Sequence, residues 1–179
     1  CSFHCAFCQN ASHWALARAG APRHSVPELV QAVDGKTACL CYFGGDPTPQ
    51  IAFSLEAAEE AWRTHPSLRL CWETNGSMSR TAAEQMAELS LESGGCVKFD
   101  LKAWDDRLHR ALCGVSNRQT LRNFRHLSRL AGGPVGSERK LGPPLTMLAW
   151  RIGPPLERAL VCVTPVAFQE QLHVLSTTH

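Results

Sequence analysis

Three short apolar runs with the composition of β-strands recur along the chain. They read "ACLCYF" from residue 38, "LRLCWE" from residue 68 and "CVKFDL" from residue 96. Their separation of about thirty residues is that of successive βα units. The pattern therefore predicts three β-strands at these positions.

Helical patterns with their own start signals accompany these runs. "SVPE" from Ser25 predicts a short helix, and "TAAE" from Thr81 has the form of a capping box. Behind Ser116 and Asn117, both good N-caps, an apolar stripe follows at helical spacing. The stripe consists of Leu121, Phe124, Leu127 and Leu130. Strands that alternate with helices predict an α/β fold with a parallel sheet, either open or closed into a barrel.

The three predicted strands end in unusual segments, "GGDPTPQ", "ETNG" and "DLK". In parallel α/β folds the functional residues gather at the carboxyl ends of the strands. Gly and Pro could serve only as turn residues, but Asp100 and Lys102 are costly to bury unless they are paired or liganded. We therefore expect a functional site, here called the mouth, at this edge of the sheet, where the three segments meet.

Composition narrows the class of protein. The chain is 44 % hydrophobic and 19 % charged, and its net charge of +2 gives no support to a nucleic-acid partner. No signal peptide or apolar run of transmembrane length is found, so no membrane partner is expected. The nine cysteines are odd in number, and several lie inside apolar runs, which is typical of buried thiols in a reducing compartment. We expect a cytoplasmic protein whose cysteines beyond the opening octet are core residues.

Both ends of the chain depart from the regular pattern. The first residue is Cys1, and we expect that a segment upstream of it is missing. From residue 131 the pattern dissolves into a stretch rich in Gly and Pro, and Pro165 interrupts the strand-like run that follows. We expect a core over residues 1–130 and an atypical tail over residues 131–179, either divergent or mispredicted.

The opening octet, "CSFHCAFC", carries Cys1, Cys5 and Cys8. Soft thiolates at close spacing bind zinc or an iron–sulfur cluster. A structural zinc site normally has four protein ligands, and His4 or His13 could be the fourth. Three cysteines without a second pair nearby favour a [4Fe–4S] cluster in which one iron stays open for another ligand.

The octet, with an aromatic residue before its last cysteine, resembles the cysteine motif of the radical S-adenosylmethionine (SAM) superfamily. "GGDP" after the first predicted strand resembles the glycine-rich loop of that superfamily, usually written GGEP. "CQN", "ETNG" and "KFDLKAWDDRLHRALCGVSNRQTL" are similar to proteins related to pyruvate formate-lyase activating enzyme. The resemblance covers residues 1–130. It implies a partial (β/α)6 TIM-like barrel whose first strand would precede Cys1.

The resemblance implies roles for the first two motifs. Cys1, Cys5 and Cys8 would hold the [4Fe–4S] cluster, whose open iron is chelated by SAM. Phe7 would contact the adenine, with core packing as the alternative. The glycine-rich loop would bind the methionine part of SAM, because a backbone without Cβ atoms permits close approach. The loop residues are Gly44, Gly45, Asp46 and Pro47, and Asp46 stands where the family usually has Glu.

The second and third strand ends have implied roles as well. Asp100 and Lys102 alternate with Leu101, so both project from the same face of the strand. By resemblance, Lys102 contacts the SAM carboxylate, and Asp100 binds a monovalent cation with Glu73 and Thr74. A structural salt bridge between Asp100 and Lys102 is the alternative.

The reaction implied by the resemblance is reductive cleavage of SAM to methionine and a 5′-deoxyadenosyl radical. This radical removes a hydrogen atom from a substrate, as in the activation of glycyl-radical enzymes. The implied partners are an electron donor such as flavodoxin or ferredoxin and a protein substrate. The competing hypotheses are an inactive truncated fragment and a non-catalytic iron–sulfur or zinc-binding protein.

Overall fold

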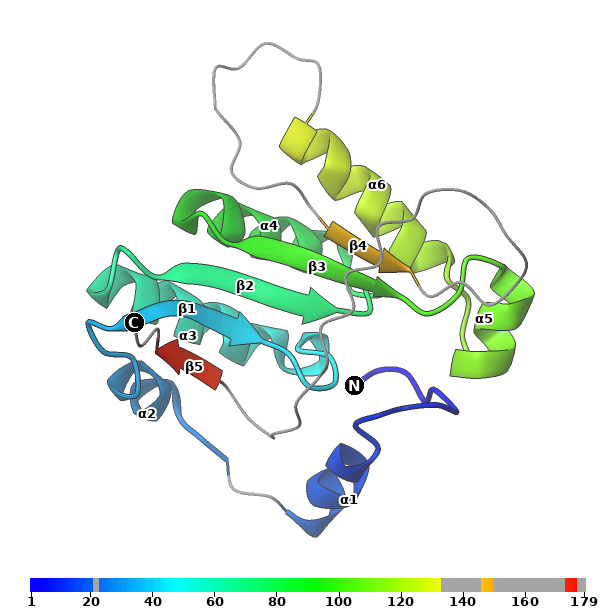
Figure 1. Cartoon of the computed structure of the whole chain (residues 1–179), viewed down its shortest axis with the longest axis horizontal. Coiled ribbons are helices and arrows are strands. Elements are labelled where there is room, and N and C mark those ends of the chain that lie inside the picture. The colour runs from blue at the N-terminus through cyan, green and yellow to red at the C-terminus, as the bar shows by residue number, and fades with distance from the viewer. Residues whose placement is uncertain (21–22, 133–145, 150–172, 177–179) are drawn as a thin grey trace.

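The computed structural model describes residues 1–20, 23–132, 146–149 and 173–176. A five-stranded sheet of order β4-β3-β2-β1-β5 lies at its centre (Figure 1). Strands β1 to β4 run parallel to one another, and β5 pairs with β1 in the antiparallel direction. The strands are β1 Thr37–Tyr42, β2 Arg69–Thr74, β3 Cys96–Leu101, β4 Thr146–Ala149 and β5 His173–Ser176.

The three strands predicted from the apolar runs are confirmed as β1, β2 and β3, the centre of the sheet. The tail supplies two short strands, β4 and β5, which lie at the two edges of the sheet. The strand-like run interrupted by Pro165 lies outside the described residues. The α/β class with a parallel sheet is therefore confirmed, whereas closure into a barrel stays a prediction.

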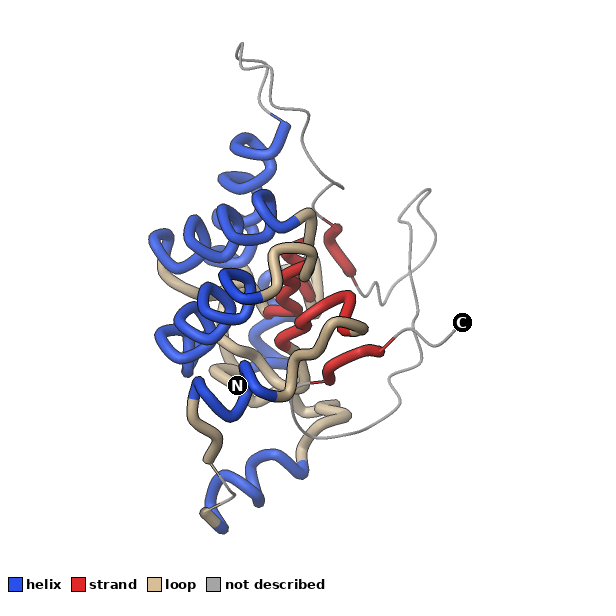
Figure 2. The backbone as a smooth tube through the Cα atoms, turned by 90° about the vertical axis from the view of Figure 1, so that its left-hand side faces the viewer, coloured by secondary structure: helices blue, strands red, loops and turns tan. Residues whose placement is uncertain are grey.

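The helices gather on one side of the strands (Figure 2). Helices α3, α4 and α6 contact β2 or β3 directly. Within the described residues, none of the helices combines the length and apolar character that crossing a bilayer requires. The helices are α1 Ser12–Ala19, α2 Val26–Gln31, the short 3-10 helix η1 Thr48–Gln50, α3 Ile51–Thr64, α4 Arg80–Ser93, α5 Asp106–Cys113 and α6 Arg118–Gly132.

The two faces of the sheet have different characters because residues alternate between them along each strand. The face under the helices is apolar and buried. On β2 it carries Leu70 and Trp72, which are fully buried, whereas Cys71 between them is half-buried and Glu73 is exposed. The hydrophobic core thus lies between the sheet and helices α3, α4 and α6, and the second face is left for thiol and charged side chains.

The helix starts follow local capping chemistry. The capping box predicted at Ser25 is confirmed, because the Ser25 side chain accepts from the Glu28 backbone and the Glu28 side chain accepts in return. The start predicted at Thr81 is wrong by two residues. Ser79 is the N-cap of α4: it is extended, and its hydroxyl accepts from the Ala82 N–H at 3.2 Å.

Gly76→Ala is expected to destabilise the fold far more than Gly94→Ala. Both glycines have similar positive φ values, 76° and 71°, which strain any L residue. A Cβ atom at Gly76 would fall on the Phe99 ring and lie 2.9 Å from the Thr120 methyl carbon, whereas one at Gly94 would meet nothing within 4 Å. Because overpacking costs about 1–3 kcal/mol, the free energy of unfolding should fall by that much more in Gly76→Ala. Urea unfolding measures the difference, and equal losses in the two variants would contradict it.

Candidate functional site

The predicted mouth is assembled at the carboxyl-terminal edge of the sheet. Residues 1–8, here called the cysteine loop, and helix α5 lie beyond the arrowheads of β1 to β3 (Figure 1). Residues 44–47, here called the glycine loop, follow β1, and Pro47 immediately precedes η1. "TNG", residues 74–76, follows from the end of β2.

Asp46 joins these three segments. Its Oδ1 accepts hydrogen bonds from the Thr74 hydroxyl at 2.6 Å and the Asn75 backbone N–H at 3.4 Å. Its Oδ2 accepts from the Ser2 hydroxyl at 3.3 Å and from the Thr48 hydroxyl. Hydrogen bonds to a carboxylate are stronger than those between neutral groups. The carboxylate therefore fastens the cysteine loop and the end of β2 to the glycine loop.

The backbone of the glycine loop lies against the cysteine loop. Gly44 and Gly45 have φ values of 86° and 138°. A Cβ atom on Gly45 would lie 3.7 Å from the Cβ of Cys1. From the other side, the Asn75 side-chain amide donates to the Ser2 hydroxyl at 2.9 Å and lies 4.0 Å from the Cys1 sulfur. The predicted ligand-binding loop and the first predicted cysteine are thus neighbours.

The cysteine loop is also held by helix α5. Phe3 and Cys5 are buried in a small apolar cluster with Cys113, the last residue of that helix. The Ala6 backbone N–H donates to the Leu112 carbonyl at 2.7 Å. The segment "KFDLKAWDDRLHRALCGVSNRQTL" therefore packs against the cysteine loop through helix α5.

Cys1, Cys5 and Cys8 are free thiols that are exposed, buried and half-buried, respectively. In the part of the chain that the structure describes, the sulfur atoms of these three cysteines do not all lie within 4.8 Å of one another. Two thiolates on one zinc ion, with Zn–S bonds of about 2.3 Å, lie at most about 4.6 Å apart. As placed, the three sulfur atoms are therefore not all close enough to share one zinc ion, and the His4 ring stacks on the Trp14 ring with centroids 5.1 Å apart. Three soft donors at wider spacing fit a cluster of several metal atoms.

Two aromatic side chains near the mouth are exposed. Phe7 has 43 % of its surface exposed, so core packing is not its role and its ring is free to contact a ligand. Trp104, which follows the end of β3, is 61 % exposed.

Asp100 and Lys102 form an ion pair at the end of β3, through Asp100 Oδ2 and the Lys102 ammonium. The salt-bridge alternative is therefore realised. Asp100 Oδ1, however, is buried and has no hydrogen-bond partner among the described residues. A buried acceptor left unpaired costs about 1–3 kcal/mol. A ligand that donates a hydrogen bond to this oxygen would remove that cost and so gain binding free energy.

The predicted cation ligands are not brought together. Glu73 and Thr74 are consecutive on β2 and project from opposite faces. The Glu73 carboxylate accepts from the Lys98 ammonium at 2.9 Å and is half exposed, whereas the buried Thr74 hydroxyl donates to Asp46. The structure gives the predicted monovalent cation at Asp100, Glu73 and Thr74 no support.

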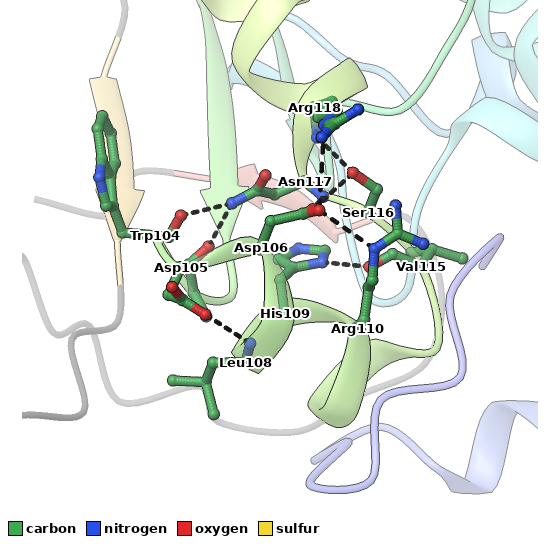
Figure 3. A network of polar contacts seen from close by, with 11 residues as sticks. Trp104, Asp105, Asp106, Leu108, His109, Arg110, Val115, Ser116, Asn117 and Arg118 are labelled. Carbon is green, nitrogen blue, oxygen red and sulfur yellow. Dashed lines mark hydrogen bonds and ion pairs between the residues drawn. The ribbon is translucent and has the colours of Figure 1, made fainter.

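A polar network fixes the loops after β3 (Figure 3). The buried Asn117 side chain donates to the carbonyls of Ala103 at 3.1 Å and Trp104 at 2.7 Å. Asp106 Oδ1 accepts from the Ser116 hydroxyl at 2.6 Å and the Asn117 N–H at 3.1 Å. Ser116 and Asn117 immediately precede α6, as predicted, and they also hold the segment that carries Lys102.

Asp106→Asn is expected to lower the melting temperature at neutral pH but not in strong acid. The hydrogen bond from Ser116, aided by Arg110 and the Asn117 backbone, lowers the pKa of Asp106 from 3.8 to about 2. Because this pKa is depressed on folding, the carboxylate stabilises the protein above about pH 4, and the contribution is lost as the pH falls towards 2. Thermal unfolding of both proteins across this range tests it. A difference in melting temperature that keeps its full neutral-pH size at about pH 2 would contradict it.

Sequence reasoning did not identify Ser2, Asn75 or His109 as parts of the site. Ser2 and Asn75 lie inside the motifs "CSFHCAFC" and "TNG", so their proximity to the named residues was the available signal. His109 is fully buried, its ring meets that of Phe3 edge-on at 5.6 Å, and its Nδ1 lies 2.7 Å from the Val115 carbonyl oxygen. It therefore supports the cysteine loop by packing.

The chain has recognisable relatives. Comparison with known families matches residues 1–146 to the Radical SAM superfamily. The isethionate sulfite-lyase activating enzyme of Oleidesulfovibrio alaskensis is 37 % identical over 84 residues. That alignment covers 47 % of this chain and 25 % of the relative, so the chain spans about a quarter of the relative's length.

Proposed function

The chain belongs to the radical SAM superfamily, and we propose that it is an enzyme of the activating type, with a [4Fe–4S] cluster on Cys1, Cys5 and Cys8. The family in general uses an iron–sulfur cluster and SAM. One observation carries the proposal for this chain: Asp46 and Ser2 join the cysteine loop to the glycine loop. The loop that carries the three free thiols therefore lies, at Cys1, beside a backbone that a small ligand can approach closely.

The side chains around the mouth suit SAM. The Lys102 ammonium would attract the SAM carboxylate, and Asp100 Oδ1 would accept a hydrogen bond from the amino group of SAM or a ribose hydroxyl. The exposed Phe7 ring would cover the adenine. Gly44 and Gly45 would approach the methionine part, since they have no Cβ. When bound together, the cluster and SAM supply reductive cleavage of SAM to methionine and a 5′-deoxyadenosyl radical.

The name of the matched relative supports a proposal for the substrate class. The matched relative is named as an activating enzyme for a lyase. We therefore propose that this chain also acts on a protein, in a reaction like that of glycyl-radical-enzyme activases. A flavodoxin, a ferredoxin or a similar protein would supply the electron, because the thiol-ligated cluster must be reduced at low potential.

Anaerobic reconstitution tests the proposal. The purified chain is treated with iron and sulfide, and the bound iron is counted; dithionite and SAM are then added, and 5′-deoxyadenosine is measured by mass spectrometry. We expect about four irons per chain and 5′-deoxyadenosine that depends on both additions. A filled cluster without product would indicate a non-catalytic iron–sulfur protein, and one zinc without a cluster would refute the proposal.

A further inference from the structure

A second group of cysteines lies on the sheet face turned away from helices α3, α4 and α6. Cys39 and Cys41 share this face of β1, because alternate residues of a strand point the same way. The strand register places Cys41 beside Cys71 of β2, and Cys71 beside Cys96 of β3. These four cysteines on three neighbouring strands are here called the thiol patch.

Three of the four sulfur atoms converge. The Cys39 sulfur lies 3.0 Å from that of Cys41 and 3.3 Å from that of Cys71. The ligand atoms of these three residues all lie within 4.8 Å of one another. Two thiolates on a tetrahedral ion with bonds of about 2.3 Å are about 3.8 Å apart. A small separation of the three side chains would therefore admit one metal ion, and the half-buried Cys41 and Cys71 have room to make it.

Hydrogen bonding alone does not explain why the three sulfur atoms lie so close together. A thiol is a weak donor and a weak acceptor, so three thiols in contact stabilise one another only slightly. A shared cation, in contrast, would bind each sulfur strongly as a thiolate and would remove the repulsion between thiolates. Cys39 is buried, which limits competition from water.

The composition of the group selects the metal. Among the side chains that the structure describes, the group holds only thiols, and all-thiolate sites favour soft ions such as Zn²⁺ and Cu⁺ over Mg²⁺, Ca²⁺ or Mn²⁺. We propose that Cys39, Cys41 and Cys71 bind one soft, thiophilic metal ion, with Cys96 beside Cys71 as the candidate fourth ligand. This site is separate from the predicted cluster site, because its ligands come from the strands β1 to β3 and not from the cysteine loop.

The test uses the full chain with Cys1→Ser, Cys5→Ser and Cys8→Ser, so that the cysteine loop can no longer bind metal through its thiols. The reduced protein is titrated anaerobically with Co²⁺, which reports thiolate ligation through its charge-transfer absorption, then with Zn²⁺ as competitor, and separately with Cu⁺. We expect one equivalent to bind with thiolate bands. Displacement of Co²⁺ by Zn²⁺ would show that the site binds zinc. Binding of Cu⁺ alone would assign the site to copper.

Two further variants locate the site in that same background. Cys71→Ser is expected to weaken metal binding at least tenfold, since even replacing a residue that only hydrogen-bonds to a metal ligand lowers metal affinity about 10–100-fold. Cys113→Ser changes a thiol outside the patch and should leave affinity unchanged. If Cys71→Ser fails to fold, the half-buried Cys41→Ser replaces it. The proposal is overturned if no equivalent binds, if both patch variants bind as before, or if mass spectrometry finds these thiols joined as disulfides in the freshly purified protein.

Discussion

Replacing Cys5 by alanine is expected to abolish both iron binding and 5′-deoxyadenosine formation, whereas replacing Cys113 by alanine leaves both in place. The two thiols are buried in the same small cluster, which joins the cysteine loop to helix α5. Burial raises the pKa of Cys113 to about 12, so this thiol stays protonated and is a poor ligand. Replacing a residue that hydrogen-bonds to a metal ligand lowers metal affinity by up to roughly 100-fold. Loss of a direct ligand should lower it by more.

The comparison separates ligation from packing. Both substitutions remove one sulfur atom from the same apolar cluster, so a loss of stability should be similar in the two variants. Bound iron after anaerobic reconstitution and 5′-deoxyadenosine by mass spectrometry are the measurements. If Cys113→Ala loses iron as Cys5→Ala does, the cluster depends on the packing of the loop, and Cys5 need not be a ligand.

Replacing Lys102 by methionine is expected to raise the KM for SAM about 30-fold or more, with a much smaller effect of Lys98→Met. Both lysines project from the same face of β3 and pair with carboxylates. Lys102 would form a second charge pair, with the SAM carboxylate, that bound SAM shields from water; truncating one partner of such a pair costs about 2 kcal/mol or more, which is about 30-fold in affinity. Lys98 pairs with the half-exposed Glu73, and such pairs contribute about 0–1 kcal/mol.

Steady-state kinetics at varied SAM concentration, with fully loaded cluster in each variant, gives the two KM values. A similar rise in the KM of Lys98→Met would mean that SAM binding depends on the positive charge of this face. It would then not depend on a direct contact with Lys102. An unchanged KM in Lys102→Met would leave this lysine with the structural salt bridge to Asp100 alone.

The central strands were predictable because each is marked by an apolar run of strand length between turn residues. The edge strands β4 and β5 were not, because four-residue segments carry too little pattern to stand out from a tail rich in Gly and Pro. The start of α4 was misplaced since both Ser79 and Thr81 are good N-caps, and only the backbone conformation chooses between them.

The candidate site was predictable to the level of segments. The quoted motifs place the cysteine loop, the glycine loop and the end of β3 at one edge of the sheet. Which side chains meet there depends on contacts across long sequence separations, and Asp46 with Ser2 is an example. The thiol patch depends in addition on the register between strands, because a shift of one residue would turn Cys71 to the other face.

The anchoring of the cysteine loop has a consequence for biosynthesis. Chains are made from the N-terminus, so the thiols of this loop leave the ribosome before the segments that hold them. Asn75, which donates to Ser2, follows 73 residues later, and Leu112, which accepts from Ala6, follows later still. During that interval Cys1, Cys5 and Cys8 are unprotected nucleophiles, open to oxidation and to the wrong metal. We therefore expect cofactor loading to follow translation of α5, and nascent chains halted before this helix to show faster thiol alkylation than finished ones.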